Sequence, residues 1–385
     1  MFNLFFKKNY LWFFFLIALV DFLYATNLYQ YIYDGHHHGY MLTNAIDFIN
    51  GRLPYKEIFI QYGIFTTLIR LLLQDKILLL TPPFTQLNTP YPATAYLKGF
   101  LNTKNIASFQ ADLGIEVMLS IFSKEGLIAV FEKAQVFEAP SDNMQRILKL
   151  KDTYIHTIDA VISFLQGKNP TLAHRIAQRN FLPEAQRFDQ LEDLNWAFGA
   201  MGIQDKAKYI ATMYLEDLAD LIKETVDPYF GFSRYAEKIG RSAQEMDALY
   251  EALLGPLSFV DEYLIALLKE KIISRQPSLV ALSVPFPGNL YAALRCGQYI
   301  KKEFPAIKIA LGDGYANTEL RSLSDQRILE FVDFICLDDG EAPLEQLFSF
   351  IQQKTEATTL KRTFHLQEDQ LVYTNASSCV DYKQA

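Results

Sequence analysis

The sequence predicts an α/β protein with a doubly wound parallel sheet, a large helical insertion and one or two N-terminal membrane helices. Short apolar runs alternate with helical patterns in residues 75–112 and again in 276–356, which is typical of a Rossmann-like parallel sheet. Residues 113–275 carry helical patterns almost throughout, and two strongly apolar runs precede residue 75. We therefore expect one sheet domain in two sequence segments, separated by a helical insertion.

The first 74 residues form the expected membrane-anchor segment. Residues 10–25 are apolar except for Asp21 and follow Lys7 and Lys8, a pattern that favours a signal-anchor helix over a cleaved signal peptide. Residues 58–73 form a second apolar run, which either completes a membrane hairpin or lies at the interface as an amphipathic helix. Either arrangement leaves the main body in the cytoplasm, and we expect residues 10–73 to anchor it to the inner membrane.

Between these runs, residues 33–63 (YDGHHHGY through QYG) resemble the start of polytopic bacterial membrane glycosyltransferases. The resemblance implies a role in sugar transfer for Asp34, but the further membrane spans of such proteins do not follow in this sequence. Three adjacent histidines, His36, His37 and His38, do not converge well on one metal ion, so we expect no metal site there. The abrupt change of character near Asp75 indicates either a fusion or a membrane-anchored enzyme.

Five short runs are expected to form the parallel strands, and they lie at residues 76–80, 106–111, 279–284, 307–311 and 331–337. Helical patterns at residues 94–101, 290–303, 320–330 and 342–353 separate or follow them. In the insertion, the clearest helices lie at residues 115–122, 143–164, 204–225 and 243–254. There we expect Glu216, Asp217 and Asp220 to lie on a solvated helix face, and we assign no ligand role to His156 or His174.

Charge and cysteine content exclude several classes of function. The formal net charge is −8 and no basic tract is present, so we expect no nucleic-acid partner. Cys296, Cys336 and Cys379 have neither zinc-ligand spacing nor the even count of a disulfide framework. These features fit a reducing compartment.

Four loops follow the expected strands, and ligands of doubly wound sheets bind at this carboxyl edge. The candidate cofactor-binding residues of these loops are Thr81, Pro83 and Asn88 after the first strand, Ser283, Pro285 and Gly288 after the third, Gly312, Asp313, Gly314 and Tyr315 after the fourth, and Asp339, Gly340 and Glu341 after the fifth. Glycines here let a ligand approach the backbone. We assign no catalytic and no metal-binding residue.

Residues 75 to about 378 resemble radical S-adenosylmethionine proteins with an N-terminal B12-binding domain. The segments that carry the resemblance are 78–101, 279–320 and 332–347, in the same order and at plausible spacing. It implies that cobalamin lies over the carboxyl edge of the sheet, with Ser283, Gly312 and Gly314 as contacts and Gly340 and Glu341 at the rim.

The sequence departs from this family in three respects. The loop after its first expected strand lacks the Asp-x-His-x-x-Gly motif whose histidine coordinates cobalt, so cobalamin would bind without that ligand, in a base-off form or without a protein histidine. Asp313 stands inside the expected glycine run. The Cys-x3-Cys-x2-Cys motif is also absent, so we expect the [4Fe–4S] cluster and S-adenosylmethionine to belong to a missing domain. Residues 357–385, with a hairpin expected at 363–375 around Glu368 and Asp369, would lead into it.

The expected function is therefore the cobalamin-binding front portion of a B12-dependent radical enzyme, not catalytic as this chain. Two alternatives remain open: a membrane glycosyltransferase fragment, and a non-catalytic Rossmann-like binding protein that has lost the cofactor. The residue at position 313 favours the last of these.

Overall fold

The computed structural model describes residues 75–85, 91–190, 198–199, 202–232, 246–323 and 325–376. The two apolar N-terminal runs, Asp34, the three adjacent histidines, Asn88 and Cys379 lie outside the described residues. The chain divides into two compact units, Met1–Asp75 and Lys76–Ala385. No helix within the described ranges is long and apolar enough to cross a membrane.

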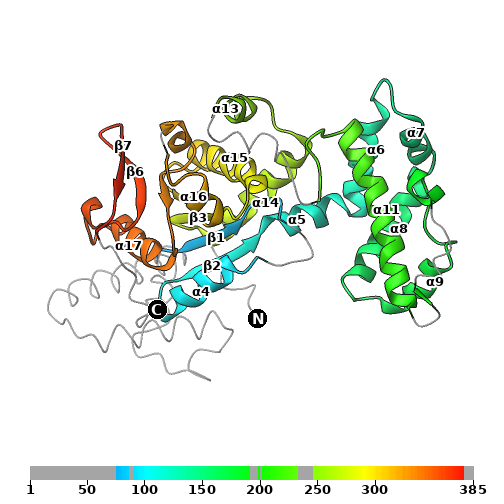
Figure 1. Cartoon of the computed structure of the whole chain (residues 1–385), viewed down its shortest axis with the longest axis horizontal. Helices are drawn as coiled ribbons and strands as arrows, with labels where there is room; N and C mark the ends of the chain where they lie inside the picture. The colour runs from blue at the N-terminus through cyan, green and yellow to red at the C-terminus, as the bar shows by residue number, and fades with distance from the viewer. Residues whose placement is uncertain are drawn as a thin grey trace, which may run out of the picture. The chain divides into compact units, whose positions relative to one another are not determined.

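A seven-stranded sheet forms the centre of the second unit (Figure 1). Its strands are β1 (Ile77–Thr81), β2 (Ser108–Asp112), β3 (Leu279–Ser283), β4 (Lys308–Gly312), β5 (Phe334–Cys336), β6 (Thr363–Gln367) and β7 (Gln370–Thr374). The order is β2-β1-β3-β4-β5-β6-β7, and β1 to β5 are parallel. The predicted α/β class and the five parallel strands are confirmed, and the order of β1 to β5 is that of flavodoxin-like doubly wound sheets.

Helices cover both faces of the sheet. Ile77 and Leu79 lie on the face covered by α4 (Ala93–Thr103) and α17 (Glu341–Ile351). Leu78 and Leu80 lie on the other face, whose core includes α5 (Leu113–Ile121), α14 (Phe259–Arg275) and α15 (Pro287–Glu303). Burial on both sides explains why β1 reads as a continuous apolar run rather than an alternating one.

The insertion is helical in its described parts, and Figure 1 shows most of its helices gathered beyond α5. They are α6 (Lys124–Gln135), α7 (Asp142–Lys149), α8 (Lys151–Leu165), α9 (Ala173–Ala177), α11 (Ile203–Thr225) and α13 (Met246–Leu254), with 3₁₀ turns η1 (Pro170–Leu172) and η2 (Gln186–Gln190). The prediction of a single helix over residues 143–164 is wrong. This segment forms two helices, because Leu150 ends α7 with a non-helical ψ of 8°.

The prediction for the acidic residues of α11 is wrong for Asp217. Glu216 and Asp220 are partly exposed and pair with Arg187, as a solvated face requires. Asp217, in contrast, is fully buried. It lies on the side of α11 that also carries the buried Tyr214 and Leu218, because these positions recur at the helical spacing of three to four residues.

Of two predictions for residues 320–375, the structure contradicts one and confirms the other. The helix predicted over residues 320–330 is absent from the described part of that range. Instead, α16 (Gly314–Thr318) precedes it and the 3₁₀ turn η3 (Gln326–Glu330) ends it, with the Asp325 side chain capping that turn. The predicted hairpin is confirmed: β6 and β7 pair in antiparallel register around Glu368 and Asp369, both at positive φ. After η4 (Ala357–Thr359), β6 also pairs with β5, so the hairpin extends the sheet.

Candidate functional site

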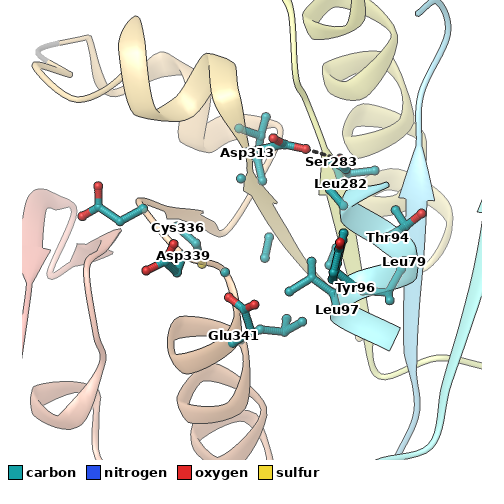
Figure 2. A pocket seen from close by; sticks show the side chains of 18 of the residues that line it. Leu79, Thr94, Tyr96, Leu97, Leu282, Ser283, Asp313, Cys336, Asp339 and Glu341 are labelled. Carbon is teal, nitrogen blue, oxygen red and sulfur yellow. Dashed lines mark hydrogen bonds between the residues drawn. The ribbon is translucent and has the colours of Figure 1, made fainter. Parts of the chain in front are cut away.

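A pocket of about 280 Å³ opens between α4 and α17, over the carboxyl ends of β3, β4 and β5 (Figure 2). Its walls are largely apolar: Leu97 comes from α4, Leu344 from α17 and Leu79 from β1. Polar side chains and glycines gather where the strands end. The pocket adjoins the β1/β3 switch point, the position at which sheets of this order bind ligands.

Two alanines create the hollow in the pocket floor. Ala281 of β3 and Ala310 of β4 are cross-strand partners, and both line the pocket. Leu279, two residues earlier in β3, packs into the core on the same face of the sheet. Because both of these adjacent positions carry alanine and not a large side chain, a space remains that α4 and α17 do not fill.

Asp313 organises the polar mouth of the pocket. Its Oδ2 accepts a hydrogen bond from the Ser283 hydroxyl at 2.5 Å, and its Oδ1 accepts one from the Tyr91 hydroxyl at 2.8 Å. The backbone N–H of Gly314 also donates to Oδ1, at 2.6 Å. Burial, together with the hydrogen bond to Asp313 and its negative charge, raises the pKa of Tyr91 to about 12. The carboxylate therefore connects the loops after β3 and β4 to Tyr91, which lies two residues before the start of α4.

The backbone of Asp313 has φ 92° and ψ −167°, a conformation that is essentially restricted to glycine. Such a conformation costs of the order of 1–3 kcal/mol for a residue with a side chain. The three hydrogen bonds to the carboxylate offset the cost, so an aspartate is held where the backbone geometry favours glycine.

The neighbouring glycines have different roles. A Cβ atom on Gly314 would lie 2.8 Å from the carbonyl oxygen of Pro285, so glycine is required for the β3 loop to pack against α16. Gly312 ends β4 and lines the pocket itself, and a Cβ there would lie 3.3 Å from the carbonyl oxygen of Cys336. Only the second of these glycines therefore belongs to the pocket.

The loop between β5 and α17 forms the other side of the mouth. Asp338 has φ 60° and pairs with Arg321. The buried Arg362 donates from Nη2 to the backbone carbonyl of Asp339 at 3.1 Å. Glu341 begins α17, and Figure 2 shows it across the pocket from Leu97. These contacts hold the loop in place beside the pocket.

The structure brings together six of the thirteen residues predicted for the site. Ser283, Gly312, Asp313, Asp339, Gly340 and Glu341 line the pocket. Thr81, Pro83, Pro285, Gly288, Gly314 and Tyr315 do not line it, and Asn88 lies outside the described residues. Tyr315, for example, is buried in the core, where its backbone N–H donates to the carbonyl of Val284.

Sequence reasoning missed the residues that give the pocket its interior. Leu97, Ala281 and Ala310 line it from the helix and the strands, not from the loops. Cys336 ends β5 inside the pocket, and burial raises the pKa of its thiol to about 11, so the thiol is protonated near neutral pH. The usable signal was the pair of alanines in strands otherwise rich in larger side chains.

The described residues contain no group of three or more histidine, cysteine or acidic side chains placed to hold a metal ion. His365 is buried in β6, where Nε2 lies 3.0 Å from the hydroxyl oxygen of Thr374, and it does not line the pocket. Comparisons with protein-family models, curated proteins and solved structures find no match to this chain. Function must therefore be inferred from the geometry and chemistry of the pocket.

Proposed function

We propose that this chain binds cobalamin, with the nucleotide base of the cofactor's tail in the pocket between α4 and α17 and the corrin ring outside it. The observation that carries the proposal is an apolar pocket with a polar mouth at the carboxyl edge of a β2-β1-β3-β4-β5 sheet. The resemblance of residues 75 to about 378 to B12-binding domains supports the same cofactor.

The size and lining of the pocket fit one part of cobalamin. At about 280 Å³ it lies at the lower end of small-molecule sites, which span roughly 300–1,000 Å³. A flat bicyclic base such as dimethylbenzimidazole fits a space of this size, whereas a corrin macrocycle does not. The apolar side chains of Leu79, Leu97 and Leu344 suit a base that carries only hydrocarbon substituents.

The polar groups around the mouth suit the amide groups of the corrin periphery. The corrin periphery carries carboxamides, whose N–H groups can donate to the carboxylates of Asp339 and Glu341. Gly312 and Gly340 leave the backbone open to close approach. No described histidine lines the pocket, so the proposal includes no protein histidine as a cobalt ligand.

Bound cobalamin would supply a cobalt centre able to carry a methyl group. The Cys-x3-Cys-x2-Cys motif that would hold a [4Fe–4S] cluster for S-adenosylmethionine does not occur in these 385 residues. The proposal for these residues is therefore cofactor binding without catalysis. Membrane anchoring through residues 10–73 stays a prediction, because those residues lie outside the described part of the chain.

The test is retention of a corrinoid by the purified full-length chain. The protein is incubated with hydroxocobalamin, passed through a gel-filtration column, and its absorbance spectrum recorded. We expect about one equivalent to be retained, and little cobinamide, which lacks the nucleotide tail. Ala281→Leu fills the pocket floor and is expected to weaken binding by about tenfold or more, because the base then meets an overpacked site.

Ala95→Leu provides the matched control, since Ala95 is exposed on α4 and does not line the pocket. It should bind cobalamin as the wild type does. Absence of retained cobalamin, or equal retention of cobinamide, would contradict the proposal.

One observation favours the alternative of a Rossmann-like protein that has lost its cofactor. The Ser283 hydroxyl, a contact implied by the resemblance, already donates to Asp313. If wild type retains no cobalamin and Asp313→Gly does, this alternative is the better one. The glycosyltransferase alternative depends on Asp34 and gains no support from the described residues.

A further inference from the structure

Two hydroxyl groups at the mouth of the pocket already donate to a carboxylate. The Ser283 hydroxyl proton and the Tyr91 hydroxyl proton are both directed to the carboxylate of Asp313, at 2.5 and 2.8 Å. Neither proton is then available to a ligand. What the ligand meets at this point is a carboxylate and the lone pairs of the serine oxygen.

The rest of the pocket lining includes possible donors, the hydroxyls of Thr94 and Tyr96 and the amide of Asn317, but its charged side chains are all acidic. The acidic side chains of Asp338, Asp339 and Glu341 line the pocket, and the lining residues include no lysine or arginine. Arg321 pairs with Asp338 but does not itself line the pocket. A negatively charged ligand group would therefore find no cation here and several carboxylates.

Asp313 differs from the other acids of the mouth in the way its carboxylate is held. Its position is set by a glycine-type backbone conformation and by three donors from three different residues. Figure 2 shows its carboxylate directed towards Ser283, at the end of β3. Ala281, Ala310 and Asp313 line the same pocket, so a ligand whose apolar part lies on the two alanines also faces this residue.

We propose that Asp313 makes the pocket selective for a ligand whose polar part carries hydroxyl donors and no phosphate at the mouth. This inference rests on the proposed function and names the group that Asp313 selects: the ribose of the nucleotide tail. In cobalamin the 2′ and 5′ hydroxyls of this ribose are free, whereas its 3′ oxygen carries the phosphodiester. The proposal therefore requires the 2′ or 5′ hydroxyl to face Asp313 and the phosphodiester to lie outside the mouth, on the side of the corrin ring. The base enters the apolar interior, and the ribose hydroxyls donate to the carboxylate. A phosphate in place of such a hydroxyl is repelled, because like charges brought together in a partly desolvated site cost binding energy.

The probes are dimethylbenzimidazole riboside and its 5′-monophosphate, which share the base and differ by one charged group. Their affinities for the full chain are measured by calorimetry in a phosphate-free buffer. Occupancy of the pocket is located by the protection of Cys336 from alkylation, followed by peptide mass spectrometry. For the wild type we expect the riboside to bind about tenfold more tightly than the monophosphate, the size of effect that one partly screened charge pair produces.

Asp313→Asn is the informative variant. Asparagine has nearly the same shape, tolerates positive φ better than most residues, and replaces the charge with an amide that can donate. The preference for the riboside should then fall several-fold, mainly through tighter binding of the monophosphate. Glu319→Gln is the matched control. Glu319 follows Asp313 by six positions and does not line the pocket, so the substitution removes one negative charge outside the site and should leave the preference unchanged.

The inference is overturned if the wild type binds both probes equally, binds neither, or keeps its preference in Asp313→Asn. If that variant does not fold, the wild-type preference and its decline with added salt still test the inference, because salt screens the repulsion of the phosphate. The two proposals fail in distinguishable ways. Riboside preference without cobalamin retention would refute only the proposed function, and cobalamin retention without any riboside preference would refute only the role of Asp313.

Discussion

The carboxyl group of Asp217 lies inside the helical subdomain, without any exposed surface. Its Oδ2 accepts hydrogen bonds from the Tyr154 hydroxyl and the Ala185 backbone N–H, both at 3.2 Å. Among the described residues, no group forms a hydrogen bond with its Oδ1. Burial is the main reason that the pKa of Asp217 rises from 3.8 to about 6, with the two hydrogen bonds acting in the opposite direction.

This shift predicts how stability depends on pH. Because the folded pKa exceeds the unfolded value, the folded state binds the proton more tightly, and the stabilisation is present at low pH and lost as pH rises from about 4 to about 6. Two pKa units correspond to roughly 2–3 kcal/mol. We therefore expect Asp217→Asn to be more stable than the wild type at pH 7.5, with the gain shrinking at pH 4.5, in urea unfolding.

Asp220→Asn is the appropriate comparison for that experiment. Asp220 lies on the same helix but is partly exposed and paired with Arg187. Its substitution should change stability little at either pH. A wild type that is as stable as Asp217→Asn at pH 7.5 would show that the buried carboxylate carries no such penalty.

At the scale of single elements, α15 is held closely against the segment that precedes β5. A Cβ atom added to Gly297, within α15, would collide with the carbonyl oxygen of Phe331. Gly99, within α4, has no atom within 4 Å of an added Cβ and is exposed. Both are glycines inside helices, where glycine is normally a poor choice.

Alanine substitutions at these two positions should therefore act in opposite directions. Gly99→Ala should stabilise the protein by about 0.5–1 kcal/mol, because alanine loses less backbone entropy in a helix. Gly297→Ala should destabilise it by about 1–3 kcal/mol or more, because the backbone of residue 331 must move. Thermal unfolding of both variants tests this, and two changes of the same sign would contradict the close contact of α15.

At the scale of the whole molecule, Arg295 connects the insertion to the sheet domain. From α15 its guanidinium donates to the backbone carbonyls of Leu253 at 2.7 Å and Ala252 at 3.0 Å, at the end of α13. It also pairs with Asp261 of α14, with Nε 3.1 Å from Oδ2 and both side chains almost completely buried. One side chain thus joins three helices from two parts of the sequence.

Arg295→Met should consequently destabilise the protein by about 3–5 kcal/mol, because it leaves the buried carboxylate of Asp261 without its partner. Denaturant unfolding measures the loss, and adding Asp261→Asn should recover part of it by removing the uncompensated charge. Arg327→Met serves as the comparison. Arg327 is only partly buried and pairs with Asp325 and Asp247, so the effect of its loss should be much smaller. Equal losses in the two methionine variants would rule out a special role for the buried pair.

Much of the architecture was predictable because it depends on local periodicity. Short apolar runs identified the five parallel strands to within a few residues, and the turn at Glu368 and Asp369 identified the hairpin. The prediction of a helix over residues 320–330 was wrong, because the apolar spacing there is compatible with both an α-helix and the short turns that are present. For the site, loop residues such as Ser283, Gly312 and Asp313 were found because parallel strands bring their carboxyl ends to one edge.

The sequence by itself determined the class of the sheet, the edge at which the polar loops meet and the glycine-rich turn that contains Asp313. The tertiary structure alone decided that Ala281 and Ala310 stand side by side beneath α4 and α17, that Tyr91 and Ser283 both bind Asp313, and that Asp217 is buried. The physical reason is the range of the interactions. Periodicity records how each segment divides between core and solvent, whereas a pocket depends on which side chains from distant segments meet and on the space they leave between them.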